Sequence, residues 1–220
     1  MIRHHPDDAL LLAQAAGRLS GGHSLLVASH LEGCADCRRR LRALEKVGGA
    51  MLEGLAPEVL ASDALARTLA AIDAPPPTQS PRAQRRAPAP HPQLPPGMPW
   101  PRALRGCSAT PWRWLGPGMR WSRVTVPGDP AANVFLLRIG AGRELPVHSH
   151  SGSELTQVLH GAFHDGRALF APGDFDEADG SFHHMPRVED AGECICLASV
   201  EGRVLFEGRV ARVMGALIGM

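Results

Sequence analysis

Residues 142–161 read GRELPVHSHSGSELTQVLHG, and this stretch decides the fold of the C-terminal half. Side chains two positions apart lie on the same face of a strand, so His148 and His150 are expected to point together into a barrel. Glu154, at the turn or on the next strand, adds an anionic oxygen, and a later strand is expected to supply a fourth ligand. The stretch therefore predicts a metal site inside a β structure.

The rest of the C-terminal half has the pattern of many short strands. Glycine, proline and aspartate turns separate short apolar runs at 134–139, 154–159, 194–198 and 203–206. Such spacing is typical of an antiparallel sandwich or barrel. We therefore predict an all-β domain over residues 102–220.

Three cysteines lie in this half. Cys194 and Cys196 are two positions apart on a late strand, so both side chains face the same way. They are interpreted either as a redox-responsive pair near the barrel metal or as two small buried residues, since free cysteine is among the most buried residue types. Cys107 has no identifiable partner.

A proline-rich segment precedes the barrel. Eleven of the twenty prolines lie between residues 74 and 101. Proline fixes φ and removes a backbone donor, so such a run forms neither helix nor sheet. Residues 74–101 are predicted to be a linker.

Residues 1–73 have a helical pattern. Four helices are expected, and glycines separate the first three: one that starts at Pro6-Asp7-Asp8 and ends at Gly21-Gly22, then Ser24–Leu31, Ala35–Val47, and a fourth that starts near Pro57. A helical domain this small buries little surface, so an additional cross-link is expected.

A cluster of metal-ligating residue types supplies that cross-link. His30, Cys34 and Cys37 form a His-x3-Cys-x2-Cys motif, and tetrahedral zinc needs one further ligand. The candidates are His4, His5 and His23; His5, next to the first helix, would tie the N-terminus to the second and third helices. A redox Cys-x2-Cys pair is disfavoured because no thioredoxin-like unit is present. Bound zinc would contribute directly to folding.

Composition excludes several classes of protein. The 220 residues carry a formal net charge of +1, whereas binding to nucleic acid through phosphate contacts requires a clustered basic excess. No apolar run reaches the ~18–20 residues that span a bilayer, and the N-terminus lacks a secretory pattern. We therefore expect a cytoplasmic protein without direct DNA or membrane binding, whose cysteines are thiols or metal ligands.

The helical half resembles a known domain. Residues 8–20, 24–30, 34–38 and 44–49 are similar to the zinc anti-sigma domain of ChrR-type proteins, whose motif is a histidine, a distant His-x3-Cys-x2-Cys and a Gly-Gly pair after the third helix. Gln14 stands where relatives usually carry tyrosine, which affects the partner surface rather than the metal site. The resemblance implies zinc bound by His5, His30, Cys34 and Cys37.

The second half resembles a cupin. Residues 142–161 match the first cupin motif without a gap, and residues 166–174 resemble the start of the second motif. The second motif's histidine is His183 or His184; the usual asparagine after it is missing, and the His-x-Pro arrangement of ChrR-type cupins selects His184. The resemblance implies zinc or another divalent metal bound by His148, His150, Glu154 and His184.

Together the two resemblances imply a regulator rather than an enzyme. Residues 1–73 would bind a group IV (extracytoplasmic-function) sigma factor, and exposed apolar residues of the first helix (Leu10, Leu11, Leu12) and the fourth (Leu60, Leu65, Leu69) are the expected contact surface. The cupin would release the sigma factor in response to oxidative stress such as singlet oxygen or organic hydroperoxide. No catalytic residue is assigned. The alternative is a metal-dependent, dioxygenase-like cupin enzyme with an accessory zinc domain; a zinc-finger DNA binder is disfavoured by the neutral charge.

Overall fold

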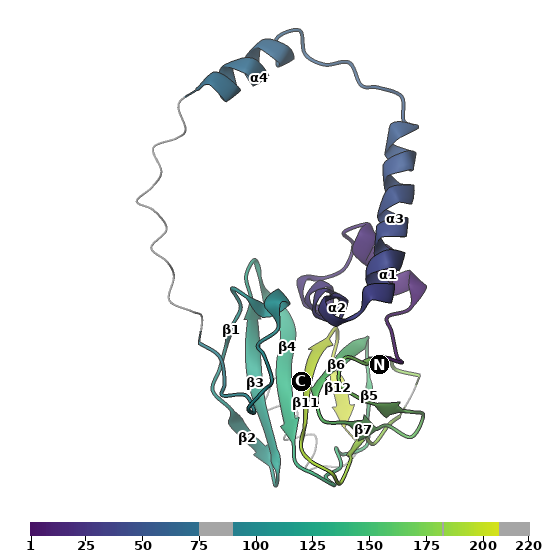
Figure 1. Ribbon diagram of the computed structural model, residues 1–220, viewed down its shortest axis with the longest axis vertical. Helices are drawn as coiled ribbons and strands as arrows, with labels where there is room; N and C mark the ends of the chain where they lie inside the picture. The colour runs from purple at the N-terminus through teal and green to yellow at the C-terminus, as the bar shows by residue number, and fades with distance from the viewer. Residues whose placement is uncertain (75–89, 182, 207–220) are drawn as a thin grey trace.

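The computed structural model describes residues 1–74, 90–181 and 183–206 (Figure 1). Of the first three helices, α1 (Asp8–Ala15), α2 (Gly21–Gly33) and α3 (Ala35–Glu53), α2 lies against a β barrel, α1 and α3 pack together beside it, and α3 extends away from the barrel, whereas α4 (Ala64–Asp73) stands apart. The predicted combination of four helices and an all-β half is confirmed. Most of the predicted linker, 75–89, lies outside the described residues, so the predicted domain boundaries remain predictions.

The first two helices begin at side-chain caps. Asp7 accepts a hydrogen bond from the backbone N–H of Leu10, and Ser20 accepts one from that of His23. The prediction that Gly21-Gly22 ends a helix was wrong, because Ser20 makes these glycines the first turn of α2. Both lie close to the barrel: a Cβ on Gly22 would come within 2.6 Å of the Ser199 hydroxyl.

The third and fourth helices also differ from their predicted bounds. α3 continues through Gly48 and Gly49 to Glu53, so the glycine pair lies inside the helix and not after it. Glycine weakens a helix without necessarily ending it. α4 begins at Ala64, and the segment after Pro57 precedes it without regular structure.

The barrel is built from antiparallel strands. The strands of its largest sheet run in the order β1-β3-β4-β11-β6-β9, and β2 also pairs with β3. Their bounds are β1 Ser108–Ala109, β2 Arg113–Gly116, β3 Met119–Val126, β4 Asp129–Ile139, β6 Glu154–His160, β9 Phe175–Ala178 and β11 Cys194–Val200. Smaller sheets pair β5 (His148–His150) with β12 (Val204–Phe206), and β7 (Phe163–His164) with β8 (Leu169–Phe170) and β10 (Arg187–Val188).

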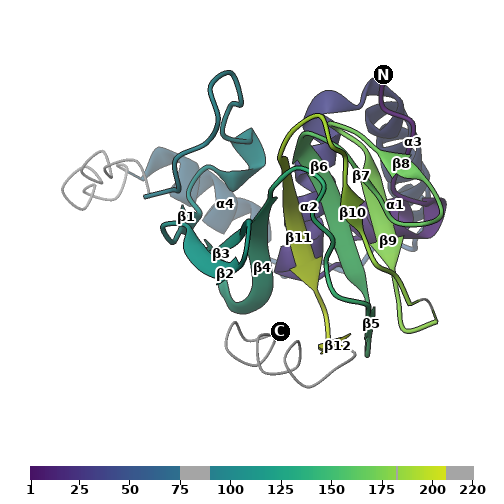
Figure 2. The ribbon, with the colours of Figure 1, turned by 90° about the horizontal axis from the view of Figure 1, so that it is seen from below.

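The central strands are buried on both faces. Along β11, Cys194, Cys196 and Ala198 face the barrel interior, whereas Ile195 and Leu197 face outward into a second apolar cluster. That outer cluster also contains Leu26 and Val27 of α2, which lies across β11, β4 and β6 (Figure 2). One continuous core thus joins the first three helices to the barrel.

The segment after residue 90 packs on the same core. Pro92 is buried, and Met98 and Trp100 lie against the outer apolar cluster just before the short 3-10 helix η1 (Arg102–Leu104). The Trp100 indole N–H donates to the Leu104 carbonyl. Among the described residues, no helix is both long and apolar enough to span a membrane.

Candidate metal centres

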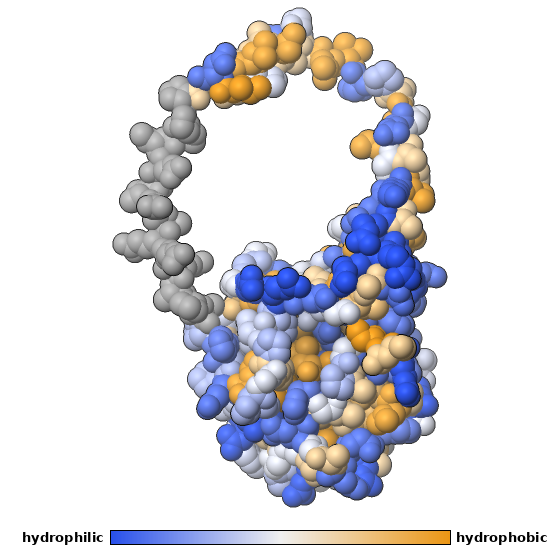
Figure 3. All heavy atoms as spheres, in the orientation of Figure 1, coloured by the Kyte–Doolittle hydropathy of each residue, from blue (hydrophilic) through white to orange (hydrophobic). Residues whose placement is uncertain are grey.

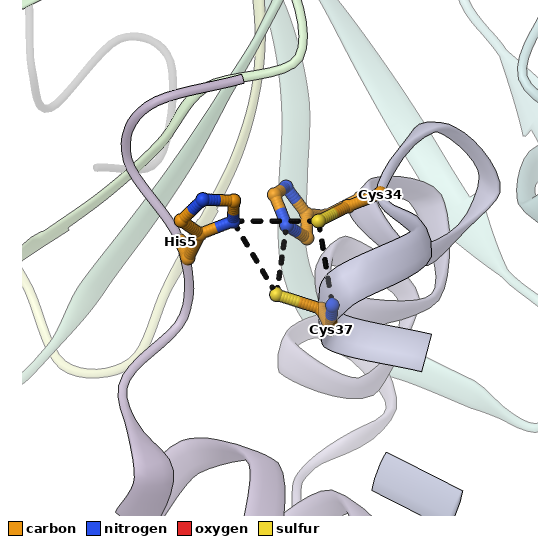
Figure 4. Close-up of side chains that lie close together, drawn as sticks. His5, Cys34 and Cys37 are labelled. Carbon is orange, nitrogen blue, oxygen red and sulfur yellow. Dashed lines mark hydrogen bonds between the residues drawn. The ribbon is translucent and has the colours of Figure 1, made fainter. Parts of the chain in front are cut away.

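Four predicted residues meet between the helices and the barrel; we call His5, His30, Cys34 and Cys37 the first cluster. Their ligand atoms all lie within 4.8 Å of one another. His5 comes from the segment before α1 and faces the two thiols at the start of α3 (Figure 4). His5 Nδ1 lies 3.3 Å from Cys34 Sγ and 3.5 Å from Cys37 Sγ, and His30 Nε2 lies 3.3 Å from Cys37 Sγ.

These separations fit a tetrahedral metal ion. Zinc bonds of ~2.3 Å to sulfur and ~2.0 Å to nitrogen place tetrahedral ligands about 3.5 Å apart. The two thiols and His30 are buried, and His5 is half-buried. Two thiolates with two imidazoles form the closed donor set of structural zinc sites, so the residues of the first cluster fit the ion that the sequence predicted.

The protonation states favour metal binding at the histidine and oppose it at the thiol. Burial lowers the pKa of His30 to about 4, so its ring is neutral at pH 7. Its Nδ1 lies 2.9 Å from the Gly173 carbonyl, which can only accept, so Nδ1 carries the proton and Nε2 is free for a metal. Burial, with a contribution from Cys34, raises the pKa of Cys37 to about 12, so this thiol stays protonated until a cation displaces its proton.

The other candidate histidines of this half lie elsewhere. The His4 ring packs beside Phe170, with ring centres 4.6 Å apart. His23 belongs to α2 and is buried against the barrel. Its two ring nitrogens lie 2.9 Å from the hydroxyls of Ser199 and Ser153. The structure therefore brings His5, and neither of these, to the thiols.

His148, His150, Glu154 and His184 form the second cluster, inside the barrel. Their ligand atoms also lie within 4.8 Å of one another. His150 Nε2 is 2.9 Å from Glu154 Oε2 and 3.3 Å from His184 Nε2. An antiparallel bridge between His148 and His184 brings the fourth residue into place, whereas His183 is exposed.

The protonation states of the second cluster also favour binding of a cation. Burial, with a contribution from the neighbouring His148, lowers the pKa of His184 to about 4. Burial alone would raise the pKa of Glu154, but the hydrogen bond from His150 and the histidine charges hold it below its usual value. His148 Nδ1 lies 2.8 Å from the Pro146 carbonyl, which leaves Nε2 free. Three imidazoles and a carboxylate suit several divalent metals.

A small cavity of about 40 Å³ adjoins the second cluster. Cys194 and Cys196 face it, with their sulfur atoms 3.6 Å apart. The Cys194 contact and burial raise the pKa of Cys196 well above its usual value, so its resting thiol is a weak nucleophile. Apolar side chains form most of the remaining wall, namely Leu137, Ile139, Leu145, Phe163, Pro186 and Val188.

The sequence reasoning missed a buried ionic network beside the second cluster. The Arg167 guanidinium contacts the carboxylates of Asp165 and Asp176 at 2.5 and 2.7 Å. Burial raises the pKa of Asp176 to about 7, although the positive charge of Arg167 acts to lower it. The available signal was Asp176 on an otherwise largely buried strand, because carboxylates are almost never buried unless paired; Asp165 lies in the turn after β7 and gave no such signal.

Comparisons with known proteins agree with both halves of the chain. The family described as the ChrR cupin-like domain matches residues 101–201. The anti-sigma-E factor ChrR of Cereibacter sphaeroides is 40% identical over 216 residues, which is 97% of this chain and 96% of the relative. The crystal structure of Rhodobacter sphaeroides SigE in complex with the anti-sigma ChrR matches with a TM-score of 0.69 and 39% identity, over 91% of this chain and 100% of that one. On sequence and fold together, the chain belongs to the ChrR family of anti-sigma factors.

Proposed function

We propose that this chain binds and inhibits an extracytoplasmic-function sigma factor through residues 1–73 and releases it when the cupin half senses an oxidant. The observation that carries the proposal is a long row of exposed apolar side chains from the end of α3 through α4. Its members are 52–90% exposed, and we call them the apolar strip: Val47, Met51, Leu52, Leu55, Val59, Leu60, Leu65, Leu69 and Ile72.

The apolar strip lies away from the barrel. α4 has no buried residue, and Figure 3 shows apolar side chains along the arc from α3 to α4, whereas the lower part of α3 is charged. Exposed apolar surface on this scale usually marks a protein partner. The predicted residues of the fourth helix belong to it; in the first helix Leu11 is buried and Leu12 is exposed.

The relatives support the identity of the partner. The matching crystal structure is described as a complex of a sigma factor with its anti-sigma factor, and it covers 91% of this chain at 39% identity. Because no residue of α4 is buried in the described part of the chain, this helix is expected to pack on the bound protein. Binding to a sigma factor also places the proposed activity in the cytoplasm.

The two clusters are proposed to hold metal ions with different roles. Zinc bound by His5, His30, Cys34 and Cys37 would cross-link the N-terminal segment to the junction of α2 and α3. Zinc or another divalent metal bound by His148, His150, Glu154 and His184 would stabilise the barrel next to the cavity.

The cavity favours a sensor over an enzyme. The volume of this cavity beside the cysteines, about 40 Å³, is far below the ~300–1,000 Å³ of small-molecule substrate sites, whereas a more open hollow of about 460 Å³ lies outside it and is lined in part by Glu154. The smaller cavity would admit a diatomic oxidant such as singlet oxygen, next to Cys194 and Cys196, which we propose as the redox-responsive pair. No catalytic turnover is proposed for the second cluster.

The test is binding to a purified extracytoplasmic-function sigma factor from the organism that encodes this chain. Replacing Leu65 and Leu69 together by Asp should weaken sigma binding at least about 100-fold, because apolar anchors at interface centres each contribute ~2 kcal/mol or more. Leu169→Asp is the matched control, since Leu169 is an exposed leucine on the barrel. Full binding by the double variant, or an equal loss in the control, would contradict the proposal.

A further inference from the structure

One turn of the cupin half holds both histidines of the first cluster. The Gly173 carbonyl accepts from His30 Nδ1 at 2.9 Å. The Asp174 carboxylate accepts the backbone N–H groups of Arg3 and His4 at 2.6 and 3.0 Å, and Phe175 N–H donates to the His4 carbonyl at 3.1 Å. The segment that carries His5 is therefore fixed to the barrel by the residues immediately before it.

The surroundings of Asp174 favour its contact with the backbone N–H groups of Arg3 and His4. It is almost fully buried, and its second oxygen accepts the N–H of Ala171 within the same turn, at 2.9 Å. Burial alone would raise its pKa, but the three N–H groups of Arg3, Ala171 and His4 hold it below its usual value. An ionised carboxylate that accepts several backbone N–H groups is a strong and directional attachment.

The same strand continues to the second cluster. Asp176, two residues after Asp174, lines the cavity beside Glu154 and His184, and its carboxylate oxygen lies within 4.8 Å of the His184 ligand atom. Thr156 and Glu154 of β6 pair with Asp176 and Ala178 of β9. A displacement of β9 would therefore move residues beside both clusters.

We infer that the segment Gly173–Asp176 positions the ligands of the first cluster and couples that cluster to the second, with Asp174 as the positioning residue. The first cluster is then completed by the cupin half, although all four of its ligands belong to residues 1–73. Hydrogen bonds that orient metal ligands commonly change metal affinity 10–100-fold. Coupling between two binding sites is reciprocal, so a change in the second cluster changes metal affinity at the first.

The first experiment measures metal affinity in the full chain by competition with a chromophoric chelator. Co²⁺ is the probe, because its thiolate charge-transfer band reports on the first cluster alone; no thiol belongs to the second cluster. Asp174→Asn should lower Co²⁺ affinity at the first cluster about 10-fold and shift the band. Asp129→Asn is the matched control: Asp129 is a barrel carboxylate that accepts the N–H of Gly21 at the start of α2, whereas His30 lies near the other end of that helix.

A second pair of variants changes the donor of the hydrogen bond between the Arg3 N–H and Asp174 and leaves the barrel sequence unchanged. Arg3→Pro removes the N–H that donates to Asp174, whereas Arg3→Ala keeps it. We expect weaker Co²⁺ binding and the same band shift only in the proline variant. Wild-type behaviour of either Asp174→Asn or Arg3→Pro, or an equal loss in Asp129→Asn, would overturn the positioning role.

The coupling is tested with Glu154→Gln, which disables the second cluster. This change should alter Co²⁺ affinity at the first cluster several-fold in the wild-type background and not in Asp174→Asn; equal effects in both backgrounds would overturn the coupling. The inference rests on the proposal that the first cluster binds metal, but not on the sigma factor. A wild-type chain without any thiolate–cobalt band would refute that metal proposal itself, whereas a band that Asp174→Asn leaves unchanged would refute only the inference.

Discussion

The two clusters orient a histidine in the same way but differ in their other ligands and in their surroundings. In each, a histidine Nδ1 faces a backbone carbonyl, Gly173 in the first cluster and Pro146 in the second, so that Nε2 is directed at the metal position. The first cluster has two thiols and lies between the helices and the barrel. The second has a carboxylate in place of the thiols and lies beside a cavity inside one barrel.

Under the proposed function, this difference would separate a structural role from a sensing role. A closed site with two thiolates holds its ion tightly and links the segments that supply the ligands. A site of imidazoles and one carboxylate next to open space binds a wider range of metals and can be reached by a small molecule. The same chain would thus use one metal site to hold the partner-binding helices together and the other to respond to a signal.

The largest expected effect comes from Cys37→Ser. Structural zinc contributes on the order of 10–16 kcal/mol of apparent folding free energy, and removal of one thiolate should abolish most of it. Helices α1–α3 should then lose their fixed arrangement, and sigma affinity should fall at least about 1,000-fold, or ~4 kcal/mol. Circular dichroism and sigma binding by calorimetry measure both. Cys107 is another buried cysteine and lies outside both clusters, so Cys107→Ser should change neither the helical fold nor sigma affinity. A Cys37→Ser chain that keeps its fold and its sigma affinity would contradict a structural role for the first cluster.

A change in the second cluster should leave sigma binding intact. Glu154→Gln removes the only carboxylate ligand and should weaken metal binding there at least about 100-fold. In excess zinc, sigma binding should stay at the wild-type level, while release by oxidant should be lost. Metal analysis should fall from two ions per chain to one. Glu193→Gln, whose carboxylate pairs with Arg138 on the barrel surface, is the control; loss of sigma binding in Glu154→Gln alone would show that the two roles are not separate.

The clusters should also differ in pH dependence. Cys37 has a pKa of about 12 without metal, so a bound ion must displace its proton, and the cost falls as pH rises. Affinity at the first cluster should therefore increase about 10-fold per pH unit for each thiol proton released between pH 6 and 8. His184, His148 and Glu154 have lowered pKa values and are already in their binding forms. Isothermal titrations at several pH values should find the second cluster nearly flat; equal slopes would contradict the comparison.

The smallest effect is expected for Cys196→Ser. The side chain is buried in the cavity wall but is not part of the second cluster, so both ions and sigma binding should be retained. Thermal denaturation should show a loss of about 1 kcal/mol. The response to oxidant should disappear, whereas a response that persists would favour the simpler interpretation of two small buried residues.

Much of both clusters could be predicted because their signals are local. His148 and His150 share a strand face by the period of two, and Cys34 and Cys37 lie one turn apart where α3 begins. The partners from elsewhere, His5 and His184, came from the resemblance to ChrR-type proteins as well as from spacing. Helix ends were less predictable: a Gly-Gly pair begins α2 at one site and lies inside α3 at the other, according to whether a cap or a neighbouring surface is present.

By itself, the sequence determined the helical and β halves, the two ligand sets and the family, because these depend on residue spacing and type. Only the tertiary structure decided that α2 shares a core with the barrel and that Gly173 and Asp174 hold the first cluster's histidine segments. The Gly173 and Asp174 contacts join residues 143 and 171 positions apart, and each uses a backbone group, the Gly173 carbonyl or the Arg3 N–H, on one side. No periodicity in the chain encodes which outer sheet face a helix will cover; the continuous apolar run of β11 indicates only that both its faces are covered.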